Sequence, residues 1–189
     1  MNEEKLNVLL ESRPVLNRRI AFYLRKNILR MQPLIEAEVK GHAEKSKHNL
    51  DFVASTFSQG YLDWVITGCY YAAYHAALSL ILSKGYSSKN HDATLCVLIK
   101  EFYKKGIEKA DIELINTFFL DYQDLLFYVE SKNKREEATY SSKYVFDRKT
   151  VEELIGRTRL FVGKAAEILE NMAPKTHEKK QDTKPSGKG

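Results

Sequence analysis

A run of 20 residues without a charged side chain, residues 64–83, constrains this chain more than any other feature. It lies inside segment 61–85, which reads YLDWVITGCYYAAYHAALSLILSKG. At 1.5 Å per residue, the uncharged run would form a helix of about 30 Å. The rest of the 189-residue chain is highly charged, since Asp, Glu, Lys and Arg make up 29% of all residues. We therefore expect this segment to be the central helix of the core.

A membrane-spanning helix is the alternative, because an uncharged run of this length can cross a bilayer. A span carries its aromatic residues near its two ends, whereas this run has polar and aromatic residues at its centre. These residues are Thr67, Tyr70, Tyr71, Tyr74, His75 and Ser79. A helix that is hydrophobic all round is also typical of the central member of a bundle. We therefore predict a protein that does not use a membrane.

The composition favours helices and a reducing compartment. There are only 4 Pro and 9 Gly, and helix-forming residues dominate. Cys69 and Cys96 both lie in apolar runs without a CxxC motif, so we expect ordinary core thiols. Residues 1–13 do not have the layout of a signal peptide. We therefore expect a cytoplasmic protein.

The positive charge is concentrated after the last expected helix. The net charge is +5, and residues 173–189 contribute five lysines against Glu178 and Asp182, or 5 − 2 = +3. The preceding residues are nearly balanced, so the basic composition is weak support for a folded nucleic-acid interface. We predict a disordered Lys-rich tail at 173–189.

Apolar spacing of three and four residues predicts an all-α protein, an up-and-down four-helix bundle. The predicted bundle helices are 33–57, 61–84, 109–132 and 150–172. Extra N-terminal helices are expected at 3–11 and from Pro14 to just before Pro33, with one short additional helix at 91–104. The predicted division is an N-terminal helical extension at 1–32, a helical bundle at 33–172 and the tail.

Local signals predict where several of these helices begin and end. Gly85 suits the left-handed residue after the central helix. Asn90 or Asp92 could cap the helix that follows. Thr150 and Glu153 have the spacing of a capping box, which would start the last helix.

Standard catalytic motifs are absent from the sequence. It has no phosphate-binding Gly-rich loop, HExxH or G-x-S-x-G motif. No acidic residue or cysteine stands at helical spacing beside His75, and no Glu-x-x-His occurs in the predicted bundle helices. We therefore predict neither a metal nor a cofactor.

One cluster could carry chemistry. Tyr71, Tyr74 and His75 lie at i, i+3 and i+4, so they share a helix face. A histidine beside phenols could act as a general base. The alternative is that these side chains are hydrogen-bonded core residues. His42 likewise could be a ligand or base, but we interpret it as a residue at the polar boundary of its helix.

Three segments, in this order and spacing, resemble the HEPN domain family, in particular the small prokaryotic HEPN proteins. The first segment is YYAAYHAA, the second is a KGY-x-x-K-x-H loop, and the third is REEATY. The matching residues are Tyr70, Tyr71, Ala72, His75, Ala76 and Ala77, then Lys84, Gly85, Tyr86, Lys89 and His91, then Arg135, Glu136, Ala138 and Tyr140. Thr139 stands where the family usually has Asp.

The resemblance implies a helical bundle that commonly forms a homodimer. Many such proteins are encoded beside a minimal nucleotidyltransferase, and such pairs often behave as toxin–antitoxin systems. The active toxins are metal-independent ribonucleases whose signature is an arginine, a spacer of four to six residues and then a histidine, and the arginine stabilises charge on the phosphate. If His75 is the family histidine, that arginine should lie at 67–70, with Gly68 as the expected position, and no arginine is there.

Three hypotheses follow. The first is a non-catalytic or degenerate module that partners a nucleotidyltransferase, or binds a nucleotide or RNA. The second is a ribonuclease toxin that uses His75, with His91 or Arg135 assisting. The third is a structural helical adaptor. The candidate nucleotide- or RNA-binding residues are Tyr71, Tyr74, His75, Lys89, His91, Arg135 and Tyr140.

Overall fold

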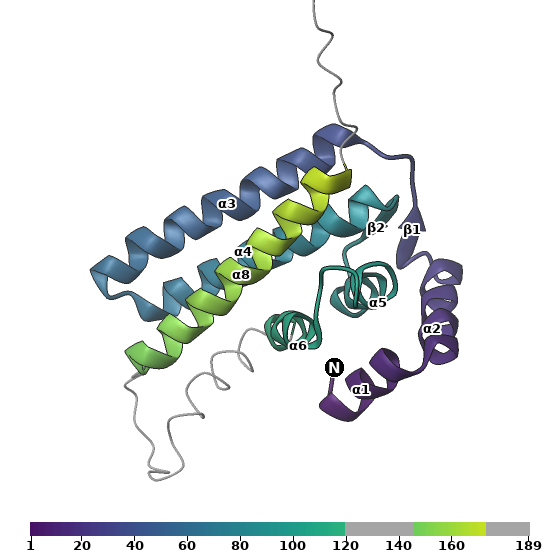
Figure 1. The fold of residues 1–189 in the computed structure, drawn as a ribbon, viewed down its shortest axis with the longest axis horizontal. Coiled ribbons are helices and arrows are strands. Elements are labelled where there is room, and N and C mark those ends of the chain that lie inside the picture. Colours follow the sequence, from purple (N-terminus) through teal and green to yellow (C-terminus); the bar gives the residue numbers. More distant parts are fainter. Residues whose placement is uncertain (120–145, 173–189) are drawn as a thin grey trace, which may run out of the picture.

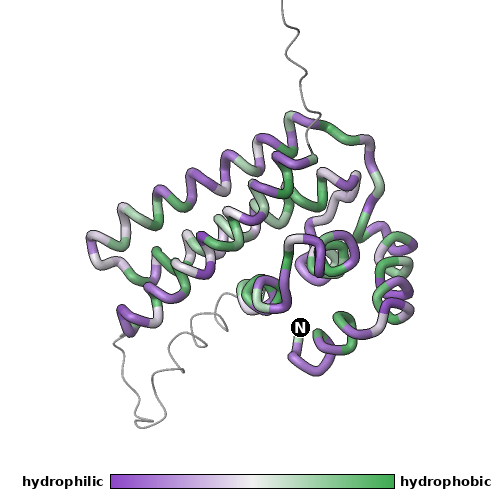
Figure 2. Tube along the Cα trace, in the orientation of Figure 1, coloured by the Kyte–Doolittle hydropathy of each residue, from purple (hydrophilic) through white to green (hydrophobic). Residues whose placement is uncertain are grey.

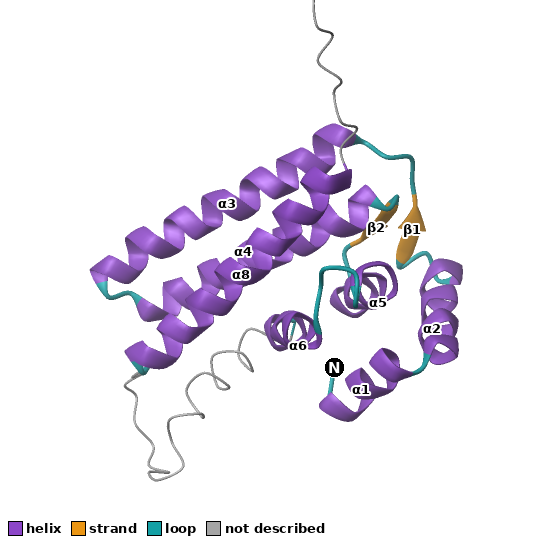
Figure 3. Ribbon diagram, in the orientation of Figure 1, coloured by secondary structure: helices purple, strands orange, loops and turns teal. Residues whose placement is uncertain are grey.

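The structure is a computed structural model that describes residues 1–119 and 146–172. Its described part consists of helices and a single pair of three-residue strands (Figures 1 and 3). The elements are α1 Glu3–Glu11, α2 Arg13–Arg25, β1 Leu29–Met31, α3 Glu36–Gln59, α4 Leu62–Ser83, β2 Tyr86–Ser88, α5 His91–Phe102, α6 Lys109–Phe118 and α8 Arg148–Met172. The predicted all-α helical bundle is confirmed.

Helix α4 is the centre of the fold, as predicted from its uncharged run. It lies beside both α3 and α8, whose axes run along it (Figure 1). Ala72, Ala73, Ala76 and Ala77 on α4 are at most 2% exposed, and their small size lets neighbouring helices approach closely. Within the described residues α4 is the one helix long and apolar enough to cross a membrane, but 78% of its apolar window is buried inside the protein.

The N-terminal helices share the core of the bundle. Hydrophilic and hydrophobic residues alternate along these helices (Figure 2), as amphipathic packing requires. Leu6 and Leu9 of α1, with Leu16 and Ile20 of α2, are buried in the same hydrophobic cluster as α4 and α5. Helix α2 packs against α5. The proposed separation of residues 1–32 from the bundle remains a prediction.

The small sheet was not predicted. Helix α2 ends at Arg25 instead of continuing to just before Pro33 as predicted, because Asn27 adopts a left-handed φ of 58°. Strand β1 then pairs antiparallel with β2, with Leu29 opposite Ser88 and Met31 opposite Tyr86. Residues 86–88, predicted as part of a loop, therefore form a strand.

Two predicted helix starts were wrong by a few residues. Helix α3 begins at Glu36 rather than at Pro33, because its cap residue Ile35 is still extended. Helix α8 begins at Arg148, before Thr150. The Asp147 carboxylate accepts hydrogen bonds of 2.9 Å from both the backbone N–H and the hydroxyl of Thr150, so Asp147 rather than Thr150 caps the helix.

Some predictions fall outside the described residues. The predicted helix 109–132 is described only as α6, up to Phe118, with Phe119 as its cap residue, and residues 120–132 are not described. Arg135, Tyr140 and the tail at 173–189 also lie outside the described residues.

The turn between α4 and α5 follows its predicted signals. Gly85 has a φ of +74°, and Asn90 caps α5 by accepting a 2.9 Å hydrogen bond from the backbone N–H of Ala93. Both features are confirmed. They matter because this turn carries β2 and leads directly to Lys89.

Replacing Gly85 with Ala should lower the free energy of unfolding by about 1–2 kcal/mol. The positive φ disfavours a side chain, and a Cβ would lie 2.9 Å from the backbone oxygen of Gln32. Denaturant unfolding measures the effect. Gly163→Ala in α8 is the matched control: its Cβ would meet no atom within 4 Å, so stability should rise by about 1 kcal/mol. Equal effects at the two sites would contradict the argument.

Both cysteines are free and buried, which confirms that they are core residues. Burial raises the pKa of the Cys69 thiol to about 12, and it does the same for Cys96. Reactive thiols need a lowered pKa and access to solvent. Neither cysteine is therefore a candidate nucleophile.

Candidate functional site

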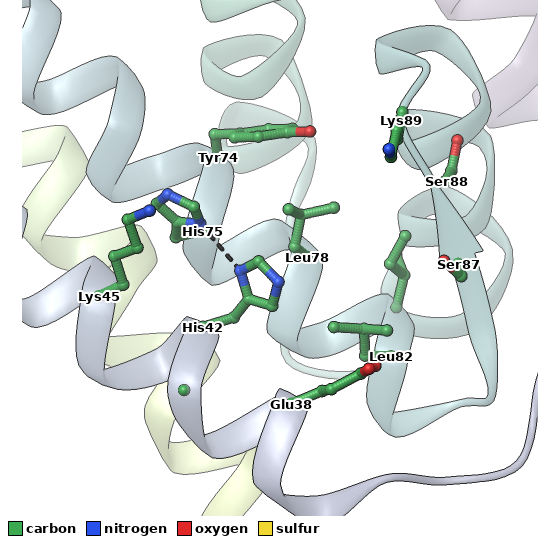
Figure 4. Close-up of a pocket in the computed structure, with 12 residues that line it drawn as sticks. Glu38, His42, Lys45, Tyr74, His75, Leu78, Leu82, Ser87, Ser88 and Lys89 are labelled. Carbon is green, nitrogen blue, oxygen red and sulfur yellow. Dashed lines mark hydrogen bonds between the residues drawn. The ribbon is translucent and has the colours of Figure 1, made fainter.

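Two histidines from neighbouring helices meet on the surface between α3 and α4. The Nδ1 atoms of His42 and His75 lie 2.9 Å apart (Figure 4). One turn further along α3, the Ser46 hydroxyl donates a 2.7 Å hydrogen bond to the carbonyl of Ala72, which sets the register of the two helices. A bond between two Nδ1 atoms needs one donor and one acceptor, so the imidazoles hold different tautomers when neutral.

The surroundings of the pair favour neutral rings. Burial, followed by the charges of His42 and Lys45, lowers the pKa of His75 to about 4. Burial and Lys45 also lower the pKa of His42, with Glu38 acting in the opposite direction. His75 itself is only 7% exposed. At pH 7 the site therefore offers hydrogen-bonding rings, while its positive charge comes from lysines.

A pocket of about 640 Å³ opens beside the two rings, and we call it the histidine pocket. Its lining comes from α3, α4, β2 and the residue after β2 (Figure 4). The lining residues are Glu38, Gly41, His42, Lys45, Tyr74, His75, Leu78, Ile81, Leu82, Ser87, Ser88 and Lys89. Lys45 points toward His75, whereas Lys89 lies on the opposite wall of the pocket (Figure 4). The pocket combines apolar walls with a few polar groups, which is typical of ligand sites.

Of the predicted site residues, Tyr74, His75 and Lys89 line this one pocket. Tyr71 is 46% exposed and its ring lies 6.5 Å from that of His75, outside the lining. His91 is elsewhere, in an aromatic cluster with Phe119, where the ring centroids are 4.4 Å apart.

The aromatic cluster has the character of core packing. The Tyr70 and Tyr74 rings stack in parallel with centroids 5.9 Å apart. The Tyr70 hydroxyl lies 3.3 Å from Nε2 of His91, and the His91 Nδ1 is buried without a hydrogen-bond partner among the described residues. Burial lowers the pKa of His91, so this ring is neutral at pH 7 as well. Tyr74 has a face in both the cluster and the histidine pocket.

Gly68 occupies a position with no room for a side chain. A Cβ there would lie 2.6 Å from Cγ2 of Val53 and 3.1 Å from Cδ1 of Phe52, both on α3. Because Val53 is fully buried, the contact cannot relax into solvent. The place expected for an arginine is thus a close contact between α3 and α4.

Sequence reasoning missed two members of the histidine pocket. His42 was interpreted as a boundary residue, and Lys45, one turn later, was not considered. The available signal was their spacing of three residues beside the apolar face of α3. Nothing in the sequence paired that face with His75. No third histidine, cysteine or acidic residue joins the pair within the described part of the chain, so the described residues hold no cluster of three metal ligands.

The model of the HEPN domain family matches residues 39–169, which is more than half of the chain. The chain belongs to the HEPN family. The match includes His42, His75 and Lys89, and it begins after β1, so the N-terminal helices and β1 lie outside it. None of the curated proteins matches the chain. In this HEPN domain His75 has a second imidazole as its neighbour, and Gly68 stands where the resemblance led us to expect an arginine.

Proposed function

We propose that this HEPN protein is a degenerate member that binds a nucleotide or RNA in the histidine pocket without cutting it. The observation that carries the proposal is the contact at Gly68, where a Cβ would lie 2.6 Å from Val53. Cleavage of a phosphodiester develops negative charge on the phosphate in the transition state, and a positioned hydrogen-bond donor or cation has to stabilise that charge. The helix that holds His75 contains no arginine, and the contact at Gly68 leaves no space for one.

The lysines of the pocket suit a phosphate group. Lys45 and Lys89 are both exposed, and neither makes an ion pair with another described residue. The one carboxylate in the lining, Glu38, accepts a 3.0 Å hydrogen bond from the Gln32 amide. Two unpaired cations against one engaged carboxylate favour an anionic ligand.

The histidines suit recognition better than catalysis. The Nδ1 atoms of the two rings bond to each other, and the second nitrogen of His75 points toward Lys45 (Figure 4). The second nitrogen of His42 faces the pocket (Figure 4). With its pKa lowered to about 4, His75 lacks the proton that an acid catalyst near neutral pH must carry.

Replacing Lys45 with Gln should weaken binding of uridine 5′-monophosphate about five- to tenfold, because the variant loses one charge-assisted contact to phosphate. Isothermal titration calorimetry at low salt measures the change. Lys47→Gln is the matched control, since Lys47 is exposed on the same helix but does not line the pocket. Equal losses in both variants, or no binding by the unmodified protein, would contradict the proposal.

Cleavage by a modified mechanism is the second candidate function. Lys45 lies beside His75 and lowers its pKa, so it could take the role of the missing cation. Incubating the purified protein with a single-stranded RNA separates the two functions. If the protein digests the RNA without added metal and the His75→Ala variant does not, the function is metal-independent cleavage and the binding proposal is wrong.

We propose further that the protein is a cytoplasmic homodimer that partners a minimal nucleotidyltransferase. Membership of the HEPN family supports this arrangement. Sedimentation equilibrium tests the dimer, and co-purification with a nucleotidyltransferase encoded next to the gene tests the partner. The remaining alternative, a structural adaptor, requires that His75→Phe leave partner binding and stability unchanged.

A further inference from the structure

A second pocket, of about 420 Å³, adjoins the histidine pocket, and we call it the arginine pocket. The two pockets share Ser87, Ser88 and Lys89. The remaining residues that line the arginine pocket are Asn27, Ile28, Arg30 and Asn90. The last two residues of β2 and the residue after them thus form a common wall between the histidine pocket and the arginine pocket.

The arginine pocket exists because the N-terminal segment is attached to β2. Leu29 is 1% exposed and anchors β1 in the core, so the next residue, Arg30, is directed outward opposite Ser87. The Ser88 hydroxyl donates a 3.4 Å hydrogen bond to the carbonyl of Ile28, and it accepts a 3.0 Å bond from the backbone N–H of Asn90. These bonds fix both walls of the pocket.

A row of cations follows the two pockets. Lys45 belongs to the histidine pocket, Lys89 to both, and Arg30 to the arginine pocket. All three are exposed, and none forms an ion pair with a residue in the described ranges. No carboxylate is among the residues that line the arginine pocket. A ligand that crossed the shared wall would therefore meet positive charge on each side of it and at the wall itself.

We propose that the two pockets bind consecutive nucleotides of one phosphodiester-linked ligand, with Lys89 at the linking phosphate and Arg30 at the next. The inference rests on the proposed binding function and adds the ligand's minimum length. Each volume falls in the range of a small-molecule site, so each can hold one nucleotide. The planar guanidinium of Arg30 can bind a phosphate with two parallel hydrogen bonds.

Part of the second subsite comes from outside the residues that the HEPN domain model matches. Asn27, Ile28 and Arg30 precede residue 39, where the HEPN match begins. The N-terminal helices and β1 therefore do more than cover α5: they supply half of a site whose other half is the HEPN bundle. The N-terminal element therefore contributes to binding by favouring a ligand of at least two nucleotides, and it has no role in cleavage.

The test compares uridine 5′-monophosphate with the dinucleotide pUpUp, which carries a 5′, a linking and a 3′ phosphate. Both ligands are titrated calorimetrically into the full chain. The dinucleotide should bind at least tenfold tighter. In Arg30→Gln the ratio of the two affinities should fall to near one, whereas Lys45→Gln should weaken both ligands and retain the ratio. Arg18→Gln is the matched control, because Arg18 is exposed on α2 and lines neither pocket.

The outcomes separate this inference from the function on which it rests. If the mononucleotide binds but the dinucleotide binds no tighter, the two-pocket inference is overturned and the proposed function stands. If Arg18→Gln lowers the ratio as much as Arg30→Gln does, general charge explains the gain and the inference is again overturned. If neither ligand binds, both proposals fail. Circular dichroism confirms that each variant is folded.

Discussion

Gly68→Ala is expected to lower the free energy of unfolding by about 1–3 kcal/mol, although Ala is a better helix former than Gly. The new methyl group would lie 2.6 Å from Cγ2 of Val53 in a contact without free volume. Either α3 or α4 must move, and that movement would disturb the packing that places His42 against His75. Denaturant unfolding of the purified variant measures the loss.

The partner substitution makes this prediction specific. Val53→Ala alone should be destabilising, because it leaves a cavity at a fully buried site. In the double variant, the space left at residue 53 should accept the methyl group at residue 68. The double variant should therefore lose less stability than the sum of the two single-variant losses, by about 1 kcal/mol or more. Strict additivity, or a Gly68→Ala variant more stable than the natural protein, would contradict the account.

The same contact bears on function. Gly68→Arg would restore the spacing that the family resemblance associates with cleavage. Because the side chain would have to enter the contact between α3 and α4, we expect a destabilised protein and no gain of ribonuclease activity. RNA digestion by a folded Gly68→Arg variant would show that the arginine position is functionally open.

Acid should destabilise the protein between about pH 6.5 and pH 4 through His75, with a total loss of about 1–2 kcal/mol because solvent screens the charge. The folded pKa is about 4, below the ordinary 6.5, so the unfolded chain binds more protons in this window. The contribution is fully present above the unfolded pKa and is lost as pH falls toward the folded one. The lowered pKa values of His42 and His91 act in the same direction.

The histidine pair gives the acid response a physical basis. A first proton can enter the pair and leave the Nδ1–H···Nδ1 bond intact, but a second proton would place two donors face to face. Urea unfolding at several pH values should show most of the slope removed in His75→Gln. His48→Gln, an exposed histidine on α3, is the control that should keep it. An unchanged slope in His75→Gln would refute the assignment.

Much of the fold was predictable from local sequence. The periodicity of residues 3–11 and the uncharged run at 64–83 predicted α1 and α4, because each pattern reflects the burial of one continuous helix. Gly85 and Asn90 were predicted because their roles depend on a few adjacent backbone groups. The β1–β2 pair was missed, since its register joins Leu29 to Ser88, far along the chain.

The candidate site was predictable only in part. Tyr74 and His75 were selected from their spacing on one helix face, and Lys89 through the family resemblance. All three line one pocket. His42, Lys45 and Arg30 belong to segments whose neighbours are set by helix register and strand pairing, so no local pattern could show that they lie near His75 or Lys89. His91 belongs to the same KGY-x-x-K-x-H motif as Lys89, but its ring packs in the aromatic cluster and not in the histidine pocket.

By itself, the sequence determined a helical protein with one uncharged central helix, the turns that end that helix, and a resemblance to the HEPN family in which no arginine precedes His75 at the expected spacing. These properties depend on side-chain spacing and local backbone preferences. The tertiary structure alone decided that His75 meets His42 and that Val53 leaves no space for a side chain at residue 68. It also placed Arg30 on the other side of β2 from the histidine pocket. The physical reason is that each of these contacts joins segments distant in the chain, and only the packing of α3 on α4 and the pairing of β1 with β2 bring them together.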